Sequence, residues 1–477
     1  MKHKIRTEAF DLMQYFYTSA HNPLIRAIIR FSGRLDPDVL RRAVELSVSA
    51  VPVFRCVFSS ETHGWEDKGF GADRIVSVSE NTEGAAAEER LLLDTIRLDS
   101  EPQLKIHLVR GPESDTLCVI ISHLVADGAG FKEYLYLLAS LYRRCLENPG
   151  FIVPPEPLDR DVGQVFRGMG AAERIRVLRS PVKIEKQEPE MFLPMEKEEG
   201  EPVTVLRRVE SELLTELKRY AKKRGATFND LMLTAYGRAH HAITGCAEFS
   251  IPCPVDLRKY LSESEKCGIC NLTSNYICRF SMKKNEPFEE TLGKTAAQMS
   301  SQKENRNCLK GPLVLDFLFA VLPYSAAKKL FDKKFSIPVV SFTNLGVLDW
   351  RRLDFGNGKI NDAYLATAVK HPPSFQVSVS TFGGRCALCS SLYATEKNRR
   401  VAERFLDGMI QELESAVSPS SHKAPAKSQN NAGGGSSAQR QPAGQQEGPD
   451  SKGERADARD KGKSKSKPKR KKTVHQK

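Results

Sequence analysis

Residues 122–128, with the sequence SHLVADG, constrain the fold of this chain more than any other segment. They follow the continuous apolar run Thr116–Ser122, which predicts a buried strand, and they precede a helical pattern from about Ala129 to Cys145. His123 and Asp127 are therefore expected at a strand-to-helix turn, where a rigid framework presents polar side chains to a ligand. On spacing alone, a partly buried structural histidine remains an equal alternative.

The His-x-x-x-Asp spacing is not specific by itself. A chain with ten histidines is expected to contain about half a match by chance, and His63 with Asp67 forms a second match here. His63 lies in the polar segment ETHGWEDKG, and Lys68 follows the aspartate, whereas Gly128 follows Asp127. We interpret His63 as a surface residue.

The first part of the chain alternates between strand and helix patterns. Apolar and β-prone runs predict strands, and apolar spacing of three and four residues predicts helices. The expected strands are Leu24–Phe31, Val53–Phe58, Leu104–Val109 and Thr116–Ser122; the expected helices begin at Asp36-Pro37, near Ala86 and near Ala129.

Residues 146–200 contain several prolines and the charged run EKEEGEP, which is typical of a crossover connection. A second series of strands and helices follows, so both halves mix helix and sheet in an α+β order. The expected strands are Val203–Val209, Phe249–Pro254, Asn275–Ser281, Val339–Thr343, Phe375–Phe382 and Arg385–Leu392, the last two joined at Gly383-Gly384; the expected helices run from Ser211 to Gly225, from Thr227 onward, and from Lys397 to Val417.

The segment IISHLVADGAGF resembles the HxxxDG region of chloramphenicol acetyltransferases, nonribosomal peptide synthetase condensation domains, wax ester synthases and alcohol acetyltransferases. The opening LIRAIIRFSGRLDPDVLRRAVELSVSAVPVFRCVF resembles their first strand and helix. ATFNDLMLTAYGRA (226–239), IPCPVDLRKYL (251–261) and VVSFTNLGVLD (339–349) resemble segments of their second lobe. Together these segments span most of residues 10–415 in the expected order.

This resemblance implies an α+β fold, a mixed α/β sandwich of two chloramphenicol-acetyltransferase-like lobes that form a pseudo-dimer. The expected domains are an N-terminal lobe of residues 1–195 that carries HxxxDG, a C-terminal lobe of residues 196–418, and a disordered basic tail of residues 419–477. The active site is expected in a tunnel at the lobe interface, entered from both faces.

The resemblance also implies roles for particular residues. His123 would be the general base that takes a proton from an acceptor, because a neutral imidazole can do so near neutral pH. Asp127 would turn away from the substrate and pair with Arg258, thereby supporting the loop of His123, although an exposed Arg258 is the alternative. Gly128 would allow close approach of the backbone at the tunnel.

Ser341, Thr343 and Asn344 are the candidates for oxyanion or substrate contacts, since polar donors aimed at a developing negative charge stabilise acyl transfer. Turn formation at a strand end is an equal alternative for each of them. Phe317, Phe319 and Leu322 are interpreted either as the lining of an apolar substrate channel or as core residues.

No metal and no tightly bound cofactor are expected; acyl-CoA or an acyl-phosphopantetheine would be the substrate. The eleven cysteines are interpreted as reduced and mostly buried. The spacings Cys267/Cys270 and Cys386/Cys389 leave a zinc site as the less favoured alternative, because such spacings commonly reflect packing. No Walker loop, G-x-S-x-G or H-E-x-x-H motif is present in the sequence.

The formal net charge of +13 comes mostly from the C-terminal segment. Residues 419–477 contain fifteen Lys and Arg against five Asp and Glu, which is 15 − 5 = +10 and leaves 13 − 10 = +3 for the rest. Residues 1–418 are nearly neutral, so they do not show the overall positive charge that is typical of nucleic-acid-binding proteins. The tail would contact anionic lipid or nucleic acid weakly, or would only keep the chain soluble. Without an apolar signal core or a membrane-spanning run, we expect a cytoplasmic protein, and a monomer.

The sequence therefore favours an HxxxD acyltransferase, of the alcohol acetyltransferase or condensation type. It would move an acyl group from acyl-CoA or an acyl carrier protein to a small alcohol or amine. One alternative is a stand-alone condensation enzyme that forms an amide between carrier-bound partners. Another is a non-catalytic binding module whose basic tail binds a polyanion.

Overall fold

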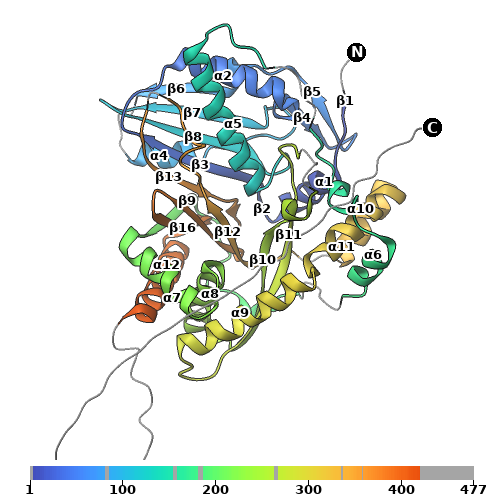
Figure 1. The fold of residues 1–477 in the computed structure, drawn as a ribbon, viewed down its shortest axis with the longest axis vertical. Coiled ribbons are helices and arrows are strands. Elements are labelled where there is room, and N and C mark those ends of the chain that lie inside the picture. The colour runs from blue at the N-terminus through green and yellow to red at the C-terminus, as the bar shows by residue number, and fades with distance from the viewer. Residues whose placement is uncertain are drawn as a thin grey trace, which may run out of the picture. The chain divides into compact units, whose positions relative to one another are not determined.

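The computed structural model describes residues 4–80, 85–153, 158–180, 186–262, 267–334, 337–356 and 358–418. One of its two main sheets has five strands in the order β13-β3-β8-β7-β6 and is drawn in the upper part of Figure 1. Neighbouring strands are antiparallel except for the parallel pair β6 and β7. The strands are β3 (Leu24–Phe31), β6 (Val76–Glu80), β7 (Leu104–Arg110), β8 (Asp115–Ser122) and β13 (Ile360–Ala366).

A second sheet follows the order β12-β15-β16-β14-β2, and β9 pairs with β16. The strands β15 and β16 form a hairpin, in which Gly383 and Gly384 have φ angles of 56° and 82° that favour glycine. The strands are β2 (His21–Asn22), β9 (Glu201–Val209), β12 (Val340–Val347), β14 (Val369–Lys370), β15 (Phe375–Phe382) and β16 (Arg385–Ala394).

Two smaller sheets complete the β structure of the described residues. One has the order β1-β5-β4, and the other is the antiparallel pair β10 and β11. Their strands are β1 (Lys4–Ile5), β4 (Cys56–Ser59), β5 (Gly64–Asp67), β10 (Glu248–Asp256) and β11 (Thr273–Ser281).

The helices α2 and α5 pack against one another over one face of the first sheet (Figure 1). Asp36 caps α2 through its side chain, and Thr227 and Asp230 form a capping box at α8. The helices are α1 (Ala9–Phe16), α2 (Pro37–Ala50), α3 (Ala72–Ile75), α4 (Ala85–Leu92), α5 (Gly128–Glu147), α6 (Ala171–Leu178), α7 (Ser211–Lys223), α8 (Phe228–Thr244), α9 (Phe288–Glu304), α10 (Lys310–Val321), α11 (Tyr324–Lys334) and α12 (Glu396–Val417).

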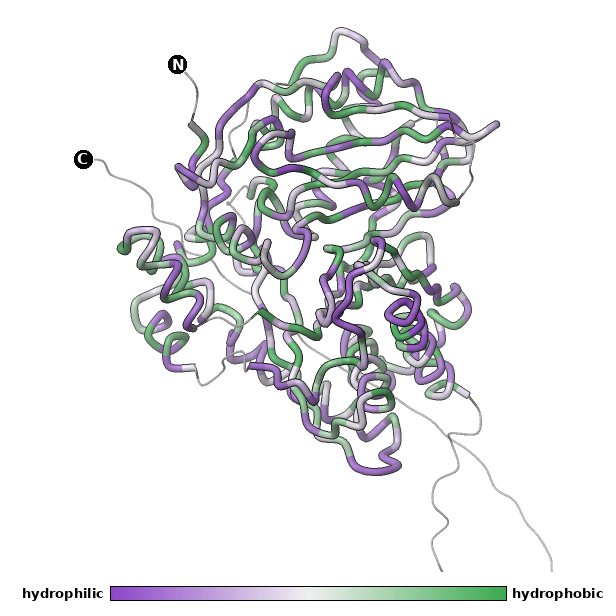
Figure 2. The backbone as a smooth tube through the Cα atoms, turned by 180° about the vertical axis from the view of Figure 1, so that it is seen from behind, coloured by the Kyte–Doolittle hydropathy of each residue, from purple (hydrophilic) through white to green (hydrophobic). Residues whose placement is uncertain are grey.

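The predicted mixed α+β class is confirmed, and long hydrophobic stretches run along the strands of the first sheet in Figure 2. The predicted strand Val53–Phe58 is wrong in its first half. Pro52–Arg55 forms a 3-10 turn, because proline fixes φ near its helical value, and β4 begins only at Cys56.

Both sheets combine strands from distant parts of the chain. β13 pairs with β3 of the first sheet, although it lies far beyond residue 195, and β2 pairs with β14 of the second sheet. The division into lobes at residue 195 remains a prediction. The predicted tail, residues 419–477, lies outside the described residues.

No helix in the described part of the chain is long and apolar enough to cross a membrane.

Candidate active site

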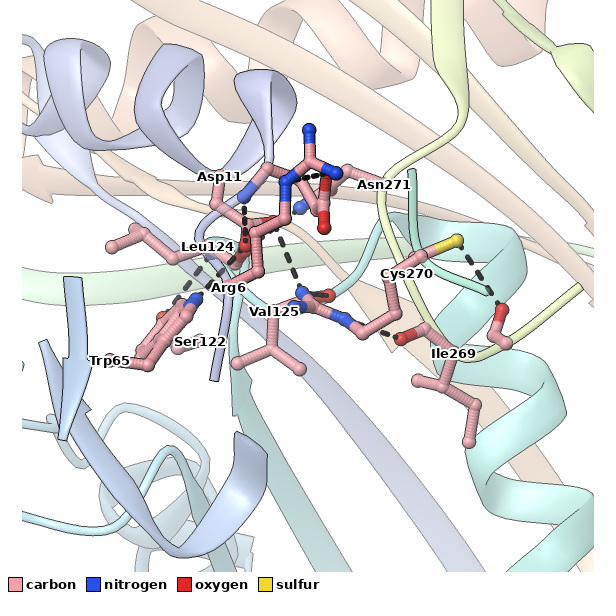
Figure 3. Close-up of polar contacts among 12 residues, drawn as sticks. Arg6, Asp11, Trp65, Ser122, Leu124, Val125, Ile269, Cys270 and Asn271 are labelled. Atoms are coloured by element: carbon pink, nitrogen blue, oxygen red, sulfur yellow. Dashed lines mark hydrogen bonds and ion pairs between the residues drawn. The ribbon is translucent and has the colours of Figure 1, made fainter. Parts of the chain in front are cut away.

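His123 follows β8 directly, and its backbone is held on both sides. Its N–H donates to the Pro23 carbonyl at 2.7 Å. The side-chain amide of Asn271 donates to the carbonyls of His123 and Leu124, at 2.9 and 3.0 Å. Figure 3 shows Asn271 and Leu124. These contacts place the turn at the end of the first sheet against a segment from the second half of the chain.

Arg160 supports the same turn from outside the cavity. Its guanidinium donates to the Val125 carbonyl at 3.0 Å, to the Ile269 carbonyl at 3.3 Å, and to Asp11 Oδ1 at 3.1 Å. The indole of Trp65 donates to the other oxygen of Asp11 at 3.0 Å, so a buried polar cluster backs the turn (Figure 3). Such a cluster restrains the turn because each buried polar group depends on its partners.

The Asp127 carboxylate is buried, and both of its oxygens accept hydrogen bonds from the protein. Its Oδ1 accepts from the Gly130 N–H at 2.8 Å, and its Oδ2 accepts from the Leu272 N–H and the Thr273 hydroxyl, both at 2.7 Å. Arg258 Nη1 lies 3.1 and 3.2 Å from the two oxygens. Burial alone would raise the pKa of Asp127, but Arg258 and these hydrogen bonds bring that pKa below its ordinary value.

At two positions of this turn, neighbouring atoms leave no room for a side chain, so both positions require glycine. A Cβ on Gly128 would lie 2.3 Å from a methyl group of Leu345. A Cβ on Gly130 would lie 2.7 Å from the backbone carbonyl of Cys270, which itself accepts from Arg258. Gly128 thus lets the turn approach the segment after Thr343, and Gly130 lets it approach the segment that holds Asp127.

A cavity of about 680 Å³ opens beside His123 and is lined by both halves of the chain. Most of its lining is apolar, as is usual for small-molecule sites. The apolar lining includes Phe10, Met13, Ile25, Val314, Leu315, Leu318 and Phe342. Entry from both faces remains a prediction.

The three apolar residues considered from the sequence do not line this cavity. Phe317 is 67% exposed and Leu322 is 37% exposed, whereas Phe319 is partly buried and packs against Phe16. The lining face of α10 is instead formed by Val314, Leu315 and Leu318. No helix was predicted for this segment, so nothing in the sequence indicated which of its side chains face the cavity.

Burial lowers the pKa of the His123 imidazole below its ordinary value. The backbone carbonyl of His123, the nearby Asp127 and the Asn271 side chain act in the opposite direction. Among the described residues, Nδ1 of His123 and Oδ1 of Asn271 are buried without a formed hydrogen bond. The imidazole is therefore neutral at neutral pH and able to accept a proton.

Ser341, Thr343 and Asn344 all line the cavity from β12. The Ser341 hydroxyl donates to the Phe375 carbonyl at 3.4 Å, and the Asn344 amide donates to Asn229 Oδ1 at 3.2 Å. Thr343 is buried and its hydroxyl makes no side-chain hydrogen bond within the described residues. Their contact with a substrate remains a prediction.

His21 and Lys370 also line the cavity, and neither was predicted from the sequence. They face one another across the short pair of strands β2 and β14. Neither belongs to a motif, and both are brought to His123 only by the pairing of distant strands. Asn271, Thr273 and Arg160 were missed for the same reason.

The second His-x-x-x-Asp match has a different environment. Asp67 pairs with Arg55 at 2.8 Å, and the His63 ring stacks on Tyr324 outside the cavity lining. Among the described residues, no group of three or more His, Cys, Asp or Glu is placed to hold a metal ion. The thiols of Cys267 and Cys270 lie 3.6 Å apart beside Arg258.

Comparison with known proteins places this arrangement in a known fold. No protein-family model matches the chain. Over 74 residues, 16% of the chain, it is 32% identical to a plipastatin synthase polypeptide from Bacillus subtilis (strain 168). The chain spans only 3% of the length of that relative.

Two solved structures resemble nearly all of the described chain. Polyketide synthase associated protein 5 from Mycobacterium tuberculosis matches with a TM-score of 0.61 and 17% identity, over 87% of this chain and 98% of that one. The first condensation domain of the calcium-dependent antibiotic synthetase, in complex with a substrate analogue, matches with a TM-score of 0.63 and 14% identity, over 88% and 100% of the two chains. The chain therefore has the condensation-domain fold, as its resemblance to that superfamily predicts.

Proposed function

We propose that the chain is an acyltransferase, with His123 as the general base. It would transfer an acyl group from a thioester donor to an alcohol or amine acceptor. The observation that carries this proposal is the difference between the two side chains of the turn: His123 is a neutral base in the cavity wall, whereas the carboxylate of Asp127 is already paired with Arg258.

The acceptor hydroxyl or amine attacks the thioester carbonyl carbon while His123 takes its proton. The carbonyl π electrons move to the oxygen, which gives a tetrahedral oxyanion. When the carbonyl re-forms, the carbon–sulfur bond breaks and the leaving thiolate receives the proton from His123. The products are an ester or amide and a free thiol, and the histidine returns to its neutral form.

The proposed tautomer places the proton on Nδ1, leaving Nε2 as the base. Nδ1 is buried without a formed hydrogen bond, and the backbone carbonyl of His123 and the side chain of Asn271 interact with the imidazole. A hydrogen-bond acceptor of this kind determines which imidazole nitrogen carries the proton.

Thr343 is the preferred candidate for a hydrogen bond to the oxyanion. Its hydroxyl lines the cavity without another side-chain partner among the described residues, whereas Ser341 already donates to a carbonyl. Removing one oxyanion donor commonly costs about a hundredfold or more in kcat.

The donor is an acyl thioester on coenzyme A or on a carrier protein. The solved structures with this fold include a synthetase condensation domain and a polyketide synthase associated protein, which supports a carrier protein as partner. Amide formation between carrier-bound substrates is the second candidate. Both use the same proton transfer at His123.

The test measures acceptor-dependent release of free thiol from a panel of acyl-CoA donors and acyl-phosphopantetheinyl carrier proteins, with pooled alcohols and amines. His123→Ala should lower turnover by about two to four orders of magnitude. His63→Asn is the matched control, since it alters the other His-x-x-x-Asp match and keeps a residue that tolerates the φ of 49°.

Turnover that is unchanged in His123→Ala excludes this mechanism. Turnover with carrier-bound donors alone identifies the condensation version. If neither donor class supports turnover, the non-catalytic binding module is favoured, and binding would then be compared with and without residues 419–477.

A further inference from the structure

Lys370 is a charged residue of the cavity that the proposed acyl transfer does not use. It lines the same cavity as His123, and only 8% of its surface is exposed. Within the described residues, no group accepts a hydrogen bond from its Nζ and no carboxylate pairs with it. An ammonium withdrawn from water without a partner is unfavourable, so an anion bound beside it would be stabilised.

The other two lysines of the cavity wall each have an acceptor. Lys132 Nζ donates to the Val347 carbonyl at 3.4 Å, and Lys310 Nζ donates to the Ser180 carbonyl. Of the lysines that line the described cavity, Lys370 is therefore the one whose ammonium has no protein acceptor.

The carboxylates of the cavity wall cannot neutralise Lys370, because another cation already holds them. Asp127 and Asp256 are the two acidic residues in the described lining. Arg258 Nη1 lies 3.1 Å from Asp127 and 3.0 Å from Asp256. His371, the residue after Lys370, takes Glu199 as its own partner at 3.0 Å.

Lys370 is connected to the reacting centre through a short stretch of backbone. It lies opposite His21 in the β14–β2 pair, and the Pro23 carbonyl, two residues after His21, accepts from His123. Burial, and then the charge of Lys370, lower the pKa of His21 well below its ordinary value, so that imidazole is neutral. Burial lowers the pKa of Lys370 to about 8, which leaves most of it protonated at neutral pH.

We propose that Lys370 binds a carboxylate of the acceptor substrate, whose hydroxyl or amine then faces His123. The assignment to the acceptor rests on the proposed function, but the binding of a carboxylate does not. One lysine matches the single charge of a carboxylate, whereas a phosphate dianion would keep an unbalanced charge in a mainly apolar cavity. The substrate class is thus a hydroxy acid or amino acid with an apolar body.

The binding test uses decanoate and decan-1-ol, which share a chain length and differ in the charged group. Their affinities are measured by titration calorimetry at pH 7 on the wild type and on Lys370→Met, which keeps the buried methylene stem and removes the charge. Decanoate should bind about ten- to a hundredfold more weakly to Lys370→Met, and decan-1-ol equally well. Lys222→Met is the control for a general loss of positive charge, since Lys222 is exposed on α7.

Equal affinity of decanoate for the wild type and Lys370→Met overturns the proposal, as does a failure of decanoate to bind the wild type. Loss of decan-1-ol binding in Lys370→Met also overturns the proposal, because Lys370 would then affect binding through the shape of the cavity and not through its charge.

The activity test compares 12-hydroxydodecanoate with its methyl ester as acceptors, and succinyl with butyryl thioesters as donors. A tenfold or greater preference for the free acid that is lost in Lys370→Met supports the acceptor assignment. A Lys370-dependent preference for the succinyl donor overturns that assignment. If the chain has no turnover but binds decanoate through Lys370, the proposed acyl transfer is refuted and the carboxylate site is not. If the chain has turnover but Lys370→Met changes neither decanoate binding nor the preference for the free acid, the carboxylate site is refuted and the acyl transfer is not.

Discussion

Asp127 and Arg258 lie 131 positions apart in the chain, yet Arg258 Nη1 contacts both carboxylate oxygens of Asp127, at 3.1 and 3.2 Å. Arg258 also donates to the Cys270 carbonyl at 2.8 Å. The pair therefore joins the turn after β8 to the segment before β11. Because the Asp127 side chain is only 2% exposed, its charge depends on this partner.

Replacing Arg258 by Met is expected to destabilise the chain by about 3–5 kcal/mol, because the buried Asp127 carboxylate loses its cation. Urea unfolding followed by circular dichroism measures this change. Asp256→Asn is the matched control: it removes the partner of Arg258 that is 45% exposed, and it should cost less than about 1 kcal/mol. A loss below about 1 kcal/mol for Arg258→Met would contradict the importance of the pair.

Gly128→Ala should lower turnover while leaving the chain folded. The new Cβ would meet the flexible end of Leu345 at 2.3 Å, so that side chain must move within the cavity wall. A cost of about 1–3 kcal/mol is expected from such overpacking. The double variant Gly128→Ala/Leu345→Ala should recover turnover relative to Gly128→Ala, as measured by thiol release. Absence of recovery would show that Leu345 is not the obstacle.

Gly130→Ala should be more damaging than Gly128→Ala. Its Cβ would lie 2.7 Å from the backbone carbonyl of Cys270, and backbone yields less readily than a leucine methyl group. The shift would disturb Arg258, which donates to that carbonyl. Thermal unfolding of the two variants side by side tests this order of stability, and the reverse order would refute it.

The pH profile of kcat/KM with an uncharged alcohol should show an acid limb below pH 6.5. Burial lowers the pKa of His123 below that ordinary value, so the neutral base persists as the pH falls to about 6.5 and is protonated only at lower pH. His21, Lys370 and Asp127 are the charged or titratable groups that act on or beside it. An acid limb centred above pH 6.5 would contradict a neutral, buried base.

Gly293→Ala in α9 should stabilise the chain by about 0.5–1 kcal/mol, since alanine is the better residue in a helix interior. Gly293 is exposed, and a Cβ there would have no neighbour within 4 Å. Chemical denaturation measures the gain, with turnover as the check that the cavity is unchanged. A loss of stability would show that the glycine has a role that its surroundings do not reveal.

Local patterns along the chain predicted most of the secondary structure. The continuous apolar residues of Leu24–Phe31 form β3, and the Thr227 capping box begins α8. Helices α1, α3, α6, α9, α10 and α11 were not predicted, and neither was β13. The strand Ile360–Ala366 carries no strong alternation, and it becomes a strand because its backbone pairs with β3.

The residues of the candidate site also fall into two groups: those that the sequence indicated and those that only the structure revealed. His123, Asp127 and Gly128 are adjacent in the sequence, so their motif is visible there, and the resemblance to a known superfamily indicated Arg258. Arg160, Asn271 and Thr273 hold the same turn, but nothing in their local sequence distinguishes them. Their hydrogen bonds join segments separated by 35 to 148 positions.

The sequence by itself determined the mixed α+β class and the turn that presents His123, because both depend on interactions between residues close together in the chain. Only the tertiary structure decided that Lys370 and His21 stand in the cavity of His123, and that Arg160 and Asn271 hold its turn. Those positions depend on the pairing of distant strands and on the burial of charges, which arise only when remote segments exclude water together.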